Sequence, residues 1–114
     1  MTTVNGFKHV GLLTKKEGQS FEEFIAHWQE VHSKIALKLP GLRSYVLNPI
    51  DRRVYPDSPI DGFSELWFDS MEEAMAAFSS PVGQQAFDDV PNFAAHVAQG
   101  RMDVLQIIAN HIPT

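Results

Sequence analysis

The chain has 114 residues, no cysteine, 14 acidic against 9 basic side chains and a formal net charge of −5, and its length suits one domain over residues 1–114. The absence of thiols excludes disulfides, thiolate catalysis and zinc sites built on sulfur. The excess of acidic side chains makes nucleic-acid binding unfavourable. The sequence has no apolar run of roughly 18 residues and no signal-peptide core, which predicts a cytoplasmic protein.

The first half of the chain predicts a strand, a helix and a second strand. Residues 7–14 (FKHVGLLT) are short and apolar, as is typical of a strand. Ser20 and Glu23 have the spacing of a capping box, so a helix should begin there. It should run to about Leu39, where a Pro-Gly pair stops it. Residues 42–48 (LRSYVLN) alternate as the next strand.

The second half repeats this order. We expect a Pro- and Asp-rich loop over 52–61, a strand over 62–68, a helix from a second capping box at Ser70 to about Phe78, short helical turns divided by prolines, and a last strand over 101–110.

The order β-α-β-β-α-β predicts an α+β protein of the ferredoxin-like class, in which helices cover one face of an antiparallel sheet. The strands carry too many apolar residues to leave both faces of the sheet exposed to water, so we expect a second copy of the chain to cover the other face in a homodimer. These residues are Leu12, Leu47, Leu66, Phe68, Leu105 and Ile107.

His32 interrupts an apolar stripe on the first helix. At about 100° per residue, it falls near the middle of that stripe, one turn after Trp28. An imidazole in this place either makes a structural hydrogen bond or serves in chemistry. The stripe consists of Phe21, Phe24, Ile25, Trp28, Val31, Ile35 and Leu39.

Four segments together resemble the EthD family of small dimeric α+β barrels, over roughly residues 7–108. They are Phe21, Phe24, Trp28 and His32; Leu39-Pro40-Gly41-Leu42-Arg43 with Tyr45; Gly62 with Glu65-Leu66-Trp67-Phe68; and Phe87-Asp88-Asp89 with Asn92-Phe93.

The resemblance implies a ferredoxin-like protomer that pairs into a dimeric barrel, with a ligand pocket between sheet and helices. The family includes or neighbours cofactor-free enzymes, among them methylmuconolactone isomerases and polyketide-tailoring dehydratases and decarboxylases. It also favours His32 as a catalytic residue. Leu66 stands where the isomerases carry a cysteine, so a mechanism that needs that thiol is not implied.

Three residues are candidates for catalysis. His32 would be the general acid or base, because imidazole titrates near neutrality. Glu65 lies between Phe63 and Trp67 on one strand face; if that face looks toward the helices, Glu65 reaches His32 and orients its ring. Tyr45 would donate to an oxyanion. The alternatives are a structural histidine, a solvated glutamate and a sheet aromatic.

Other residues are candidates for binding substrate. Aromatic side chains more often build a core, but several lining one cavity would favour a flat substrate. His9 could be a second titratable group there, and Asp89 matches the family segment, although Asp88 and Asp89 also suit local caps. His27 and His96 are interpreted as surface residues. The aromatic candidates are Trp28, Trp67, Phe24 and Phe93.

The hypothesis is therefore a lyase, dehydratase or isomerase that moves a proton on an aromatic, lactone or polyketide-like substrate. We expect no metal and no cofactor, since no ligand cluster or nucleotide motif is seen. Two alternatives stay open. The first is an accessory protein of a degradation pathway that only binds a ligand, and the second is a barrel monooxygenase that uses haem.

Overall fold

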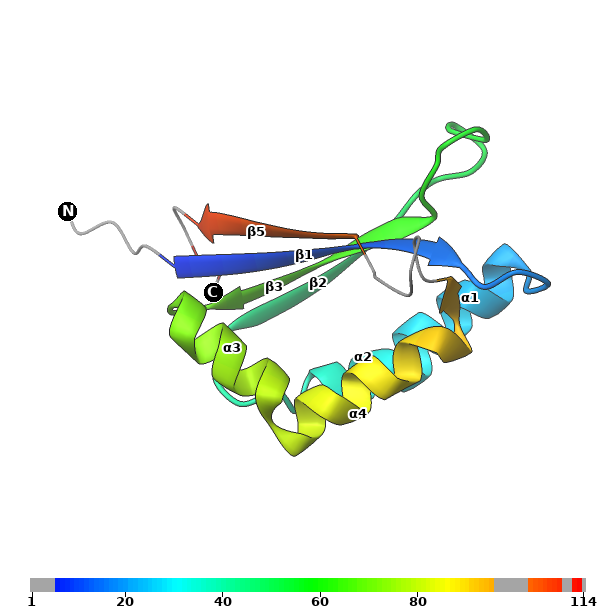
Figure 1. Ribbon diagram of the computed structural model, residues 1–114. Helices are drawn as coiled ribbons and strands as arrows, with labels where there is room; N and C mark the ends of the chain where they lie inside the picture. The colour runs from blue at the N-terminus through cyan, green and yellow to red at the C-terminus, as the bar shows by residue number, and fades with distance from the viewer. Residues whose placement is uncertain (1–5, 96–102, 110–111, 114) are drawn as a thin grey trace.

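A computed structural model describes residues 6–95, 103–109 and 112–113. Its strands and helices follow the predicted order, except that Pro81–Asp89, where short helical turns were expected, form a nine-residue α-helix, and Ala94–Ala95 add a short strand (Figure 1). They are β1 Gly6–Lys15, α1 Phe21–His27, a π-helical turn Trp28–His32, α2 Ser33–Ala36, β2 Ser44–Pro49, β3 Gly62–Phe68, α3 Met71–Ser79, α4 Pro81–Asp89, a 3-10 turn Val90–Asn92, β4 Ala94–Ala95 and β5 Asp103–Ala109.

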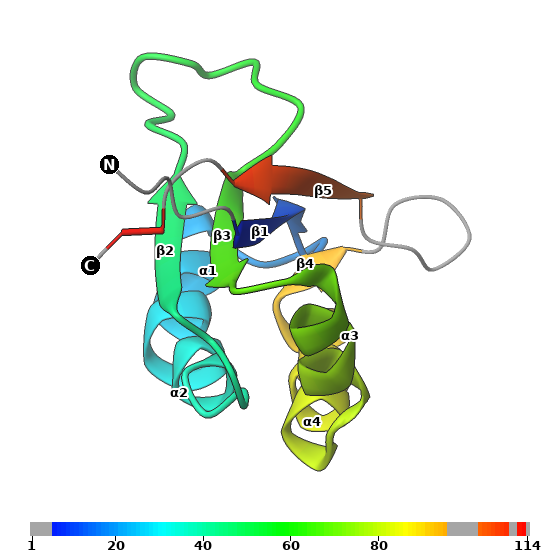
Figure 2. The ribbon, with the colours of Figure 1, turned by 90° about the vertical axis from the view of Figure 1, so that its left-hand side faces the viewer.

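The four long strands form one antiparallel sheet in the order β5-β1-β3-β2, and the short β4 pairs with the end of β1. In the register, His9 of β1 lies opposite Leu66 of β3 on one side and Gln106 of β5 on the other. The helices that the structure describes lie on one face of this sheet (Figure 2). This arrangement confirms the predicted ferredoxin-like α+β class. None of the helices among the described residues is long and apolar enough to cross a membrane.

Both predicted helix starts are confirmed. Ser20 Oγ accepts from the backbone N–H of Glu23 at 3.1 Å, and Glu23 Oε1 accepts from the backbone N–H of Ser20 at 3.2 Å. These two bonds satisfy donors that the first turn of a helix leaves without partners. Ser70 Oγ caps α3 with the first of these bonds, accepting from the N–H of Glu73 at 3.2 Å.

The first helix is not continuous, which corrects the expected single helix to Leu39. A π-helical turn interrupts it, and the backbone N–H of Ser33 bonds to the carbonyl of Trp28, five residues earlier. The wider turn holds one extra residue, so the buried stripe rotates within and after it. Ser33 is therefore buried, whereas Val31, expected on the stripe, is 46% exposed.

Two hydrophobic clusters join the helices to the sheet. Phe24 and Trp28 are fully buried in the first, together with Phe93 and Leu13. Gly62 allows this packing, because a Cβ at that position would lie 2.7 Å from the Trp28 ring. The second cluster joins α2 and α3 to the other end of the sheet. It consists of Phe7, Ala36, Leu39, Leu66, Phe68, Ala74 and Ala77.

Candidate functional site

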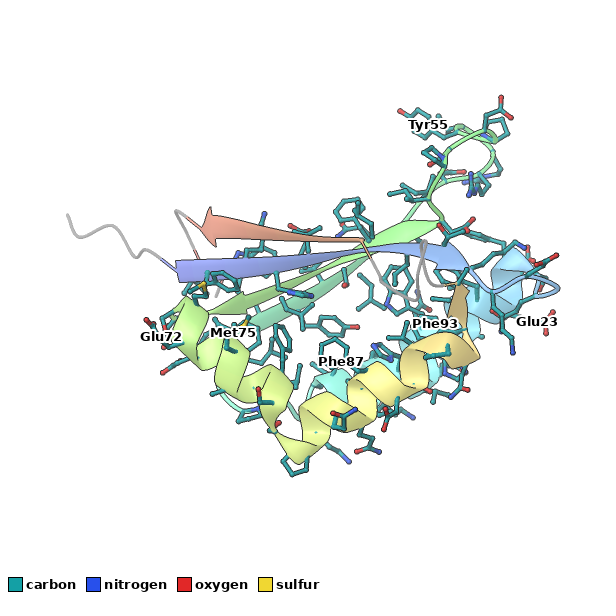
Figure 3. The ribbon with its side chains drawn as sticks, in the orientation of Figure 1. Glu23, Tyr55, Glu72, Met75, Phe87 and Phe93 are labelled. Atoms are coloured by element: carbon teal, nitrogen blue, oxygen red, sulfur yellow. The ribbon has the colours of Figure 1, made fainter. Side chains whose placement is uncertain are left out.

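A pocket lies between the sheet and the helices, as the resemblance implied. Its cavity volume is about 50 Å³, and the space around this cavity opens to solvent. The sheet supplies His9 and Tyr45, and the π-helical turn supplies His32. Phe87 and its neighbours make the helical wall apolar; Figure 3 shows Phe87 and Phe93 on the side of the helical layer that faces the sheet. An apolar cavity with a few convergent polar groups is typical of a small-molecule site.

His32 lies at the end of the π-helical turn and lines this pocket. Its Nδ1 is 2.8 Å from Oδ2 of Asp89, and its side chain is 13% exposed. Its Nε2 makes no hydrogen bond to any residue that the structure describes. The ring lies against Phe93, with the ring centres 4.8 Å apart. One nitrogen is therefore bound to a carboxylate, and the other is available to a ligand.

Asp89, at the end of α4, is the carboxylate that orients His32. It is 8% exposed and also binds Nε2 of His27 at 3.0 Å and Nδ2 of Asn92 at 3.0 Å. The bond to Asn92 fits the expected local cap, but the bonds to the two histidines join α4 to the first helix. The interpretation of His27 as a surface residue is wrong. The family segment with Asp89 and Asn92 was the sequence signal that could have revealed this cluster.

The environment favours a neutral His32 beside an ionised Asp89. Burial lowers the pKa of His32, although the hydrogen bond and charge of Asp89 act in the opposite direction. Burial raises the pKa of Asp89, but hydrogen bonds from Asn92, His27 and His32 outweigh it and hold the pKa below its ordinary value. Because an ionised carboxylate only accepts, Nδ1 of His32 carries the proton and Nε2 presents a lone pair.

Tyr45 also lines the pocket, from β2. Burial raises its pKa to about 12, and the nearby indole N–H of Trp28 opposes this shift. That indole N–H is buried and makes no hydrogen bond of ordinary geometry within the described residues. The phenol therefore remains protonated at neutral pH and can donate a hydrogen bond to a ligand in the pocket.

We predict that Tyr45 makes the protein less stable at alkaline pH. The unfolded chain loses this proton near pH 10, whereas the folded protein keeps it to about pH 12. The free energy of unfolding should therefore be unaffected by this group below pH 10 and fall as the pH rises toward 12, by roughly 2 to 3 kcal/mol. Urea unfolding of the native protein and of Tyr45→Phe, at pH 8 and pH 11, measures about half of this loss, roughly 1.4 kcal/mol, in the native protein alone.

The chain offers a matched control, because it has two tyrosines and the other, Tyr55, is 63% exposed. Tyr55→Phe should keep the alkaline loss of stability that Tyr45→Phe removes. Equal pH dependence in the native protein and the Tyr45→Phe variant would contradict the assignment.

Glu65 does not contact His32, so the predicted His–Glu pair is wrong. Its Oε2 accepts from Lys8 Nζ at 3.2 Å and its Oε1 accepts from Asn48 Nδ2 at 2.8 Å. The reason is the alternation of β3, whose Leu66 packs toward the helices while Glu65 and Trp67 point to the opposite face. Trp67, also expected in the pocket, lies on that outer face beneath Lys8, whose Nζ is 5.3 Å from the ring centre.

The remaining candidates lie near the pocket in different ways. His9 lines it, is 6% exposed and packs against Phe78, with ring centres 4.6 Å apart. Phe24, Trp28 and Phe93 are fully buried and form the core beneath the site.

No group of three or more His, Asp or Glu side chains in the described parts of the chain could hold a metal ion. His96 lies outside the described residues.

Fold and pocket together define the class: a ferredoxin-like α+β protein with an apolar pocket between its sheet and its helices. Residues 16–96 match the model of the EthD domain, so the chain belongs to the EthD family. A relative, an uncharacterized 11.0 kDa protein in the thcB-thcC intergenic region of Rhodococcus erythropolis, is 31% identical over 72 residues, which are 63% of this chain and 70% of the relative.

Solved structures share the fold at lower identity. An EthD family protein from Bacillus halodurans has a TM-score of 0.73 and 20% identity over 90% of this chain and 96% of its own. A dimeric ferredoxin-like protein from Thermobifida fusca has a TM-score of 0.68 and 14% identity over 92% of each chain. A hydroxynitrile lyase from Passiflora edulis has a TM-score of 0.64 and 15% identity over 96% of this chain and 97% of its own.

Proposed function

We propose that the protein is a cofactor-independent enzyme that transfers a proton on a small, largely apolar carbonyl compound such as an aromatic ketone, a lactone or a polyketide-like molecule. The observation that carries this proposal is the pairing of His32 with Asp89 at 2.8 Å on the wall of an apolar pocket. A histidine oriented by a buried carboxylate is a common general base.

In the proposed reaction, Nε2 of His32 removes a proton from the carbon next to the substrate carbonyl. The electron pair of the C–H bond moves onto the carbonyl oxygen, where the Tyr45 hydroxyl donates a hydrogen bond to the resulting enolate. Asp89 stabilises the imidazolium. The same proton then goes to a leaving hydroxyl in a dehydration, or to another carbon in an isomerisation, which restores neutral His32.

The chemistry of the residues that line the pocket supports this substrate class. Its walls are mainly aliphatic and aromatic, with Leu66, Phe78 and Phe87 among them, and its polar groups are few. Such walls suit a flat, apolar ring, and the polar groups suit one or two oxygen atoms. The hydroxynitrile lyase from Passiflora edulis is an example of a lyase built on the same fold.

Hydrogen–deuterium exchange tests the proposal without knowledge of the true substrate. The protein is incubated in D₂O with aryl ketones, hydroxyketones and lactones, and deuterium in the product is measured by mass spectrometry. We expect exchange at the carbon next to the carbonyl in at least one compound, at a rate proportional to protein concentration. Compounds that bind without any exchange would instead support a ligand-binding accessory protein.

We also propose that a second copy covers the outer face of the sheet, as expected for a homodimer. Leu47, Leu66 and Phe68 pack toward the helices instead of lying on this face. Trp67 lies on the outer face but is already buried against Ile112, whereas Val46 on the same face is 36% exposed. The related protein from Thermobifida fusca is dimeric. Sedimentation equilibrium should give the mass of two chains, and the mass of one chain would contradict the proposal.

A further inference from the structure

His27 shares the carboxylate of Asp89 with His32, although it lies outside the pocket lining. Its Nε2 is 3.0 Å from Oδ1 and 3.1 Å from Oδ2, so it bridges both oxygens. His32 Nδ1 contacts Oδ2 alone, at 2.8 Å. Asn92 Nδ2 contacts Oδ1 alone, at 3.0 Å. Each oxygen therefore has two donors, and His27 is the one that they have in common.

The π-helical turn is what brings the two histidines to one carboxylate. His27 and His32 are five residues apart, and in a regular α-helix such residues point in different directions, because neighbours on one face are three or four apart. A π-helical turn closes its hydrogen bond over five residues. The bond from the N–H of Ser33 to the carbonyl of Trp28 is of this kind, and its two residues directly follow His32 and His27 in the chain.

The Phe93 ring packs against both imidazole rings. The His27 ring stacks on it with centres 5.0 Å apart and planes 15° apart, and the His32 ring lies at 4.8 Å and 44°. Phe93 is fully buried and packs against Phe24, which fixes its own position. The orientation of each imidazole is thus determined by a ring contact and by a bond to Asp89.

Asp89 can hold the His32 ring in one orientation only if its own carboxylate does not rotate. Asp89 can rotate about its terminal bond, and Asn92, three residues away, holds only one of the two oxygens. The bridging N–H of His27 holds both oxygens and so opposes that rotation. The other titratable groups that face His32 are His9 and Tyr45, which lie across the pocket.

We propose that His27 is a positioning residue: its Nε2–H holds the Asp89 carboxylate so that His32 keeps its proton on Nδ1 and its lone pair on the Nε2 that faces substrate. This inference rests on the proposed function of His32. His27 itself touches no substrate, and no proton passes to it during the reaction.

Two substitutions separate this role from a purely structural one. His27→Phe keeps a ring to stack on Phe93 and removes the N–H. His27→Gln places an amide N–H near the former position of Nε2 and restores the donor. The readouts are the ¹⁵N chemical shifts of His32, which report the nitrogen that carries the proton, and kcat and KM in the exchange assay.

In His27→Phe, we expect the two nitrogens of His32 to share the proton more evenly and kcat to fall about tenfold with little change in KM, as for a loss of positioning of the base. His27→Gln should keep the native shifts and kcat within about threefold of native. Native shifts and kcat in His27→Phe would overturn the proposal, and so would a Gln variant that behaves like the Phe variant.

The same measurements distinguish a failure of this inference from a failure of the proposed function. If the His32 shifts change in His27→Phe but the native protein exchanges no compound, the positioning role stands and the proposed function fails. If the native protein exchanges protons and both variants match it, the function stands and the positioning role fails.

Discussion

Replacing His32 by alanine is expected to reduce the rate of the proposed proton transfer about 10²- to 10⁴-fold, the contribution that general acid–base catalysis by one side chain commonly makes. The native ring presents Nε2 to the pocket while Nδ1 is bound to Asp89, and alanine supplies no basic atom. The exchange rate per protein molecule measures the loss. The fold should remain, because Asp89 keeps its bonds to His27 and Asn92.

His32→Asn is the matched control. The asparagine amide nitrogen takes nearly the position of Nδ1, so it can still donate to Asp89, but nothing basic remains at the position of Nε2. We expect the His32→Asn and His32→Ala variants to be equally inactive. The free energy of unfolding of His32→Asn should be nearer to that of the native protein. An Asn variant that retains native turnover would show that His32 only supports the structure.

Replacing Trp28 by alanine is expected to lower the free energy of unfolding by about 3 to 5 kcal/mol, the range typical of a large aromatic residue removed from a core. Trp28 is fully buried and packs over Gly62 of β3. The centres of its ring and of the Phe24 ring are 5.4 Å apart. Its loss would leave a cavity between the first helix and the sheet. Denaturant unfolding followed by circular dichroism measures the change.

Val31→Ala is the control for Trp28→Ala, three residues further along the same helix. Sequence periodicity places Trp28 and Val31 on the same apolar stripe, but Val31, within the π-helical turn, is 46% exposed. We expect this substitution to cost less than about 1 kcal/mol. A loss as large as that of Trp28→Ala would mean that the stripe continues without rotation and that the π-helical turn is absent in solution.

The elements of the fold could be predicted because local rules govern them. The serine and glutamate of a capping box are three residues apart, so Ser20 and Ser70 identified both helix starts. The strand over 62–68 was predicted with the bounds that the structure has. Its side chains alternate without interruption between a glycine and a capping serine. The π-helical turn has no such local signature.

The site was predictable only in part. His32 was recognisable as a polar residue on an apolar stripe, and it does line the pocket. The partner predicted for it, Glu65, lies on the wrong face of the sheet. Alternation shows which residues of a strand share a face, but it does not show which face the helices cover. Phe63 and Trp67 flank Glu65, and their size suggested that this face packs against the helices, which is wrong.

The sequence by itself determined the helix starts, the strands, the ferredoxin-like order and the candidate base, since each depends on residues close together in the chain. The tertiary structure alone decided the partner of that base. Asp89 is 57 positions from His32, and its bond forms only when α4 packs against the first helix. The bridging contact from His27 depends in addition on a π-helical turn. Propensity disfavours such a turn, and packing of Trp28 and His32 can stabilise it.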